Sequence, residues 1–222
     1  MLLTLGNLQA VRTHVVPALN LQFENAFSVK LTDEAKTIKD VVNQIDMQLF
    51  QAYTQPTVVR LRHLVQAGIA SPSWPPSPPP SAKPTAPRPY VYTCLLTLVL
   101  VHAQVSAATP SLVAHILSFL FEQLTREMAA SLRERMERYA LGALMQATLD
   151  VEFVAQTLAL YTTATTTDLQ SAIYAELDAR TDDDARARLQ GELPEMRSLL
   201  KRLREKSRNE FGCFKKPRKA RE

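Results

Sequence analysis

The chain has 222 residues, of which 46% are hydrophobic and 22% are charged, a composition typical of a soluble globular protein. Only 5 residues are glycine, which disfavours glycine-rich phosphate-binding loops and folds built on tight hairpins. At roughly 150 residues per domain, the length predicts one large domain or two small ones. The two cysteines, Cys94 and Cys213, lie far apart in the sequence, which favours a reducing compartment without a disulfide framework.

Residues 1–70 are predicted to form three helical pieces. The first extends to about Ala26, and Thr32 is a candidate N-cap for the second, with acidic residues in its first turn. The second piece carries an apolar stripe on one face, formed by Ile38, Val42, Ile45 and Leu49. Pro56 is predicted to end or restart the helix, and Gly68 is a candidate C-terminal cap for the third piece.

Residues 71–89 are predicted to be a disordered, proline-rich linker. Nine of the 14 prolines of the chain lie here, and repeated proline favours polyproline II over helix or sheet. Proline-rich segments also match SH3-type ligand patterns by chance, so an inert loop is the preferred interpretation.

The longest stretch without a charged side chain is 90–121. Its strongly apolar part, 94–101, is only eight residues long, whereas a membrane-spanning helix needs about 20. We therefore interpret the helix predicted over 92–107 as a buried core helix.

Further helices are predicted in the rest of the chain. Thr109 and Pro110 form a start signal for a long helix whose apolar stripe is Val113, Leu117, Leu120, Leu124, Met128, Leu132, Met136 and Tyr139. Helices over 141–161 and after the threonine-rich turn 162–168 follow, and Thr181 with three aspartates opens the last one, which Pro194 is expected to kink or split. The sequence thus predicts an all-α fold of seven or eight helices.

The sequence therefore divides into four predicted segments: a helical segment at 1–70, the linker at 71–89, a helical bundle at 90–208, and an aromatic anchor with a basic tail at 209–222.

Residues 191–222 carry a net charge of +6 and the first 190 residues carry −2. A basic end on a nearly neutral body suggests an acidic partner. The alternative is a solvated helix end whose cations complement the macrodipole.

The last segment holds the only candidate site. Phe211 and Phe214 are expected to anchor the chain end on the bundle, because each aromatic side chain can bury about 150–250 Å². Cys213 is not a prenylation site, because nine residues follow it. Contact with anionic lipid is expected from five cations, namely Lys215, Lys216, Arg218, Lys219 and Arg221.

No motif for chemistry accompanies this site. The sequence has no GxGxxG, GxxxxGK[ST] or GxSxG motif, and its four histidines show no metal-ligand spacing. Glu152 is expected to be partly buried between Val151 and Phe153, but it has no partner nearby in the sequence. We therefore predict no catalytic, cofactor-binding or metal-binding residues, no small-molecule substrate and no enzyme activity. Nucleic-acid binding is disfavoured because the cations follow the last apolar stripe instead of lying along a recognition element.

Several stretches resemble a known family, namely 20–50, 90–113, 141–158, 176–205 and 209–216. They are similar to the C-terminal region of the Sec-five subunit of the exocyst complex, in its fungal form. The resemblance implies an elongated rod of stacked helical bundles without a catalytic site. It also implies a scaffold subunit that binds other exocyst subunits and helps to tether secretory vesicles before fusion, in the cytoplasm at plasma-membrane sites of secretion. The alternative is a stand-alone helical adaptor whose basic tail binds lipid or nucleic acid.

Overall fold

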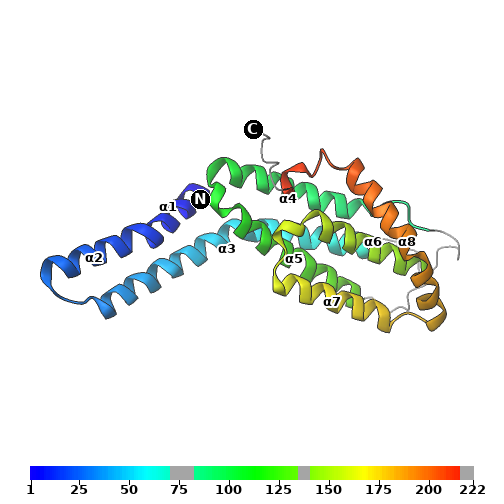
Figure 1. Cartoon of the computed structure of the whole chain (residues 1–222), viewed down its shortest axis with the longest axis horizontal. Coiled ribbons are helices and arrows are strands. Elements are labelled where there is room, and N and C mark those ends of the chain that lie inside the picture. Colours follow the sequence, from blue (N-terminus) through cyan, green and yellow to red (C-terminus); the bar gives the residue numbers. More distant parts are fainter. Residues whose placement is uncertain (71–82, 135–140, 216–222) are drawn as a thin grey trace. The chain divides into compact units, whose positions relative to one another are not determined.

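All regular secondary structure in the described part of the chain is helical, as a computed structural model shows (Figure 1). The structure describes residues 1–70, 83–134 and 141–215. Over these ranges the helices are α1 (Leu2–Ala10), α2 (Val16–Phe27), α3 (Thr32–Ala70), α4 (Pro89–Ala108), α5 (Val113–Glu134), α6 (Leu141–Thr157), α7 (Ala164–Ala179) and α8 (Asp183–Lys206). One π-helix, Val11–Val15, and three 3-10 turns, Pro110–Leu112, Ala159–Tyr161 and Gly212–Phe214, join or follow them. The all-α prediction is confirmed.

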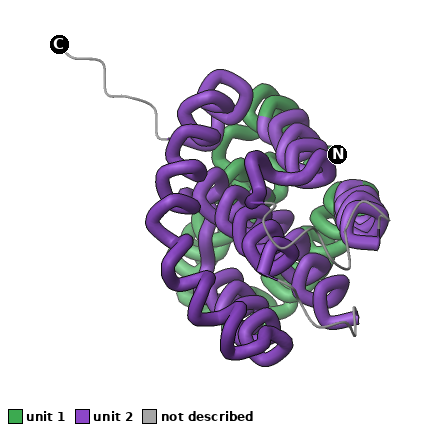
Figure 2. Tube along the Cα trace, turned by 90° about the vertical axis from the view of Figure 1, so that its right-hand side faces the viewer, with its two compact units in different colours: residues 1–56, 103–116 green, residues 57–102, 117–222 purple. Residues whose placement is uncertain are grey.

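The helices form two compact units (Figure 2). Unit 1 comprises residues 1–56 and 103–116, and unit 2 comprises residues 57–102 and 117–222. The helices α3, α4 and α5 each contribute residues to both units.

Unit 1 contains a helical run that changes its winding before Pro17. The proline has no N–H to donate, and its ring would meet the carbonyl group of Thr13 in a regular α-helix. The chain instead forms the wider π-helix Val11–Val15 directly before α2. After α2 the chain turns at Ser28, which has a left-handed backbone with φ of 54°. Arg12 Nη1 then bonds Asp46 Oδ2 of α3 at 3.1 Å.

The predicted apolar stripe of 38–49 is only partly covered in unit 1. Ile38 and Ile45 are 43% and 42% exposed, while Val42 and Leu49 are half-buried. On α2, no residue is buried. The apolar spacing therefore correctly predicted a helix, but it did not predict how far the apolar face of this helix is buried.

The predicted roles of Pro56 and Gly68 are wrong, and the predicted split of the last helix at Pro194 is absent. The helix α3 passes unbroken through Pro56, and α8 passes unbroken through Pro194. A proline inside a helix costs about 3 kcal/mol, and burial on the same helix offsets this cost, since Val58, Leu61, Val65 and Ile69 of α3 are buried. Gly68 is not a cap, because α3 continues to Ala70. The lack of a side chain at Gly68 instead gives room for the ring of Tyr90.

Unit 2 holds the larger core. Leu117, Leu120 and Leu124 of α5 are fully buried, and so are Leu95 and Leu98 of α4. The helix α4 is long and apolar enough to span a membrane, with a mean hydropathy of 1.6. Leu95 and Leu98 are buried, as predicted for a core helix, whereas Leu96 and Leu100 of the same helix are 48% and 60% exposed. Met136 and Tyr139 of the predicted stripe lie outside the described residues.

The end of the proline-rich segment packs on unit 2. Lys83 Nζ bonds Glu192 Oε2 at 2.6 Å and Glu195 Oε2 at 2.8 Å, both on α8. The backbone N–H of Arg88 donates to Asp150 Oδ1 of α6 at 3.0 Å. Residues 71–82 of the predicted linker lie outside the described residues.

Candidate functional site

The chain folds back on itself after α8 and presents its aromatic residues to the core. Ser207 Oγ donates to the carbonyl of Leu203 at 2.9 Å, and the N–H of Phe211 donates to the carbonyl of Ser207 at 3.1 Å. These bonds give partners to backbone carbonyl groups at the C-terminal end of α8. The chain then enters the 3-10 turn Gly212–Phe214. As a result, Phe211 and Phe214 are 3% and 1% exposed.

The two rings join an aromatic cluster in unit 2. The ring of Phe211 lies 6.3 Å from that of Tyr92 and 6.2 Å from that of Phe153, between centroids. The ring of Phe214 meets the ring of Tyr161 edge-on at 6.0 Å. Such spacings are favourable for aromatic pairs and add to the stabilisation from burial. The chain end therefore covers α4 and α6 with apolar surface.

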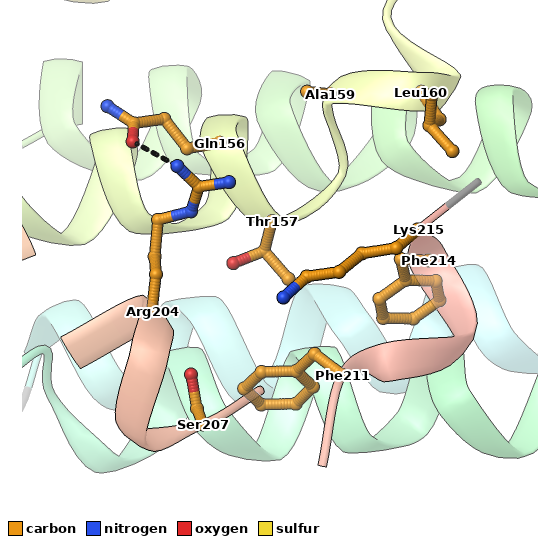
Figure 3. Close-up of a pocket in the computed structure, with 9 residues that line it drawn as sticks. All are labelled: Gln156, Thr157, Ala159, Leu160, Arg204, Ser207, Phe211, Phe214 and Lys215. Carbon is orange, nitrogen blue, oxygen red and sulfur yellow. Dashed lines mark hydrogen bonds between the residues drawn. The ribbon is translucent and has the colours of Figure 1, made fainter. Parts of the chain in front are cut away.

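A pocket of about 320 Å³ opens beside this cluster (Figure 3). It lies between the end of α6 and the end of α8. Its lining residues are Gln156, Thr157, Ala159, Leu160, Arg204, Ser207, Phe211, Phe214 and Lys215. The lining thus combines two cations and two hydroxyl groups with aromatic and aliphatic side chains, and it includes no carboxylate.

The structure brings three of the predicted site residues to this pocket: Phe211, Phe214 and Lys215. The other four cations, Lys216, Arg218, Lys219 and Arg221, lie outside the described residues. Lys215 is exposed. The anchoring role of the two aromatics and the lipid contact of the cations stay predictions.

Arg204 is the site residue that sequence reasoning missed. Its Nη1 donates to Gln156 Oε1 at 3.0 Å. The Gln156 amide group in turn donates from Nε2 to Glu152 Oε2 at 3.0 Å, which orients its oxygen toward the arginine. Arg204 follows Leu200 by four residues, so the helical repeat placed it beside a buried position of α8, and this was the available signal.

The hydrogen-bond chain continues to α7. Tyr174 Oη donates to Glu152 Oε1 at 2.6 Å. Burial, and then this bond to a carboxylate, raise the pKa of Tyr174 above its ordinary value, so the phenol stays protonated as a donor. Both carboxylate oxygens of Glu152 therefore accept a hydrogen bond. The chain of bonds links α7, α6 and α8 and ends at Arg204.

Neither cysteine is an activated thiol. Burial raises the pKa of Cys213, in spite of the cations that follow it in the sequence. Burial raises the pKa of Cys94 to about 12. Low reactivity follows for both, because the thiolate is the reactive form. Over residues 1–70, 83–134 and 141–215, no group of three His, Cys, Asp or Glu side chains is arranged for a metal ion.

Comparison with known proteins decides the family. The family model described as "Exocyst complex component Sec5" matches residues 1–214. The chain belongs to this exocyst family. The match to the Sec5 model includes both aromatics of the chain end and stops just before Lys215, so the basic tail is outside it. No curated protein and no solved structure matches the chain.

Proposed function

We propose that this Sec5-family chain is a non-catalytic scaffold subunit of the exocyst that tethers secretory vesicles to the plasma membrane before fusion. The family match over residues 1–214 carries the proposal. In this role the chain binds other exocyst subunits in the cytoplasm and makes peripheral contact with anionic membrane at sites of secretion through its basic end.

The exposed apolar side chains of unit 1 support a role in binding proteins. They lie along α2 and the first part of α3, and they are Leu19, Phe23, Phe27, Ile38, Val41 and Ile45. Large apolar side chains that are exposed in number along one pair of helices are candidates for contact with a protein partner. A scaffold needs such surface, whereas it needs no reactive group.

The alternative function is that of a stand-alone helical adaptor with a basic tail that binds lipid or nucleic acid. The net charge of +6 over residues 191–222 is the observation that favours it. The two functions differ in their partners, so identification of the partners separates them.

The test is affinity capture of the tagged chain from cell lysate, followed by identification of the recovered proteins. Recovery of the other exocyst subunits is expected. The control is Leu120→Asp, which places a charge at a fully buried position and should unfold unit 2. Recovery of nuclear proteins without exocyst subunits, or equal recovery by the control, would contradict the proposal.

A further inference from the structure

We propose that the pocket between the ends of α6 and α8 binds the phosphate of an anionic lipid headgroup, with Arg204 and Lys215 as its cationic ligands. This inference rests on the peripheral membrane contact included in the proposed function. It assigns that contact to a defined site in place of a diffuse tail.

Arg204 is held in place by hydrogen bonds from the neighbouring helices. Its guanidinium is held through Nη1 by the chain Tyr174, Glu152 and Gln156, with links of 2.6, 3.0 and 3.0 Å. The oxygens of Glu152 accept from Tyr174 and Gln156, and no ion pair is formed by Arg204 among the residues that the structure describes. Arg204 is therefore a positioned cation with N–H donors left for a ligand.

Two cations and two hydroxyl groups line the same pocket. Figure 3 shows the Lys215 side chain extending toward Thr157, and one terminal nitrogen of Arg204 that is not engaged by Gln156, among the residues that line the pocket. A planar guanidinium matches two oxygens of a phosphate, and a lysine adds a point charge. Together with the absence of a carboxylate from the lining, this arrangement selects an anion with several acceptor oxygens.

Apolar side chains beside the pocket favour a lipid over a soluble anion. The pocket has an apolar rim, because Leu160 is 47% exposed beside it and Ala159 is exposed as well. Four more cations of the sequence, Lys216, Arg218, Lys219 and Arg221, follow directly after Lys215. Apolar side chains next to basic ones suit the boundary between headgroups and acyl chains.

The experiment is co-sedimentation of the full chain with vesicles of phosphatidylcholine that contain phosphatidic acid. The site variant is Arg204→Gln with Lys215→Gln. The matched control is Arg197→Gln with Lys201→Gln, which removes the same charge from exposed positions of α8 outside the pocket. We expect the site variant to lose at least about tenfold more vesicle affinity than the control, since two charge-assisted contacts are removed.

Equal losses in the two variants would overturn the proposal, because general charge would then explain the binding. The proposal would also be overturned if the parent protein sedimented with pure phosphatidylcholine vesicles as well as with vesicles that contain phosphatidic acid. Lys215→Gln alone changes an exposed residue, so it gives an interpretable result even if the Arg204 change disturbs the fold. For this single variant, a loss larger than that of Lys201→Gln alone is expected, and an equal loss counts against the pocket.

Two further measurements identify the source of the phosphate. Glycerol 3-phosphate and inorganic phosphate are titrated into the protein by calorimetry, and we expect weaker binding than to vesicles because neither engages the apolar rim. Binding of inorganic phosphate as tight as binding to vesicles would overturn the lipid assignment. So would binding of a phosphorylated peptide by a chain that ignores the vesicles.

The failure of this inference differs from failure of the scaffold proposal. Both double variants are also used for affinity capture from lysate. If the exocyst subunits are recovered but vesicle binding is unaffected by the site variant, only the lipid pocket is wrong. If no exocyst subunits are recovered by any folded form, the scaffold proposal is wrong.

Discussion

Asp150 is a buried carboxyl group whose titration is expected to make the stability of the fold depend on pH. Its side chain is 1% exposed on α6, and its Oδ1 accepts bonds from the N–H of Arg88 at 3.0 Å and from Gln146 Nε2 at 2.9 Å. Burial raises the pKa of Asp150 from 3.8 to about 6, and it outweighs the bonds and the Arg88 charge, which lower the pKa. The Arg88 guanidinium is still 4.0 Å away at Nε, too far for a strong ion pair.

This raised pKa predicts a loss of stability as pH rises. Between about pH 4 and pH 6 the folded state holds a proton on Asp150 that the unfolded state has released, so the free energy of unfolding falls with pH. A shift of about two pKa units corresponds to about 3 kcal/mol. We compare the free energies of unfolding of the parent and Asp150→Asn by urea titration at several pH values. The advantage of the parent over the variant should shrink by roughly this amount across the window and then level off above about pH 6.5.

The comparison with Asp150→Asn removes the contributions of other titrating groups, which both proteins share. A parent advantage that grows with pH would show the opposite, namely a carboxylate whose pKa the Arg88 charge lowers. The sequence singled out Glu152 and not Asp150. Glu152 is half-buried as expected, but the expectation that it has no nearby partner is wrong, because Gln156, four residues on, donates to it. Its second partner, Tyr174, is 22 residues away, and Asp150 meets Arg88 across 62 residues. These two distant pairings have no local signal in the sequence.

At the scale of elements, the sequence predicted the helices well and their interruptions poorly. Apolar spacing located α5 and α8, and the threonine-rich turn holds a real N-cap, since Thr163 Oγ1 accepts from the N–H of Thr166 at 3.2 Å. Pro56 does not end α3 and Pro194 does not split α8, because local propensity weighs one lost hydrogen bond, whereas the fold adds the burial of the whole helix. Burial on α3 and α8 depends on segments far away in the sequence.

The chain end after α8 gives a prediction at this scale. Phe211→Ala with Phe214→Ala should lower the melting temperature, because each buried phenylalanine contributes about 3–5 kcal/mol relative to alanine. Thermal unfolding followed by circular dichroism measures the effect. The matched control is Leu96→Ala with Leu100→Ala, two apolar side chains of α4 that are exposed. The control should change stability by about 0.5 kcal/mol or less per site.

An unchanged melting temperature in the phenylalanine variant would mean that the chain end is not an anchor. Replacement of Lys215, Lys216, Arg218, Lys219 and Arg221 by Gln should leave the melting temperature unchanged, because the sequence predicts that these cations lie in solvent, where a charge contributes little to folding. The two results together separate an anchoring role of the aromatics from a binding role of the cations.

At the scale of the whole molecule, stability is expected to be uneven between the units. Each unit joins segments that are distant in sequence, 1–56 with 103–116 and 57–102 with 117–222. The chain passes from one unit to the other within α3, α4 and α5, and no shift in composition marks these points. The sequence alone therefore did not indicate the units. The burial that distinguishes them is also a property of the tertiary structure: α2 has no buried residue, whereas nine residues of α6 are buried.

This difference predicts the pattern of amide hydrogen exchange. Local opening requires little free energy where few apolar side chains are buried, so amides of α2 and of the first half of α3 should exchange faster than amides of α6. Exchange followed by mass spectrometry of peptides measures it, and α6 of the same sample is the internal control. Equally slow exchange in α2 and α6 at low protein concentration would contradict the expectation. If the scaffold proposal is right, addition of the captured exocyst subunits should slow exchange in α2, because a partner then covers Leu19, Phe23 and Phe27.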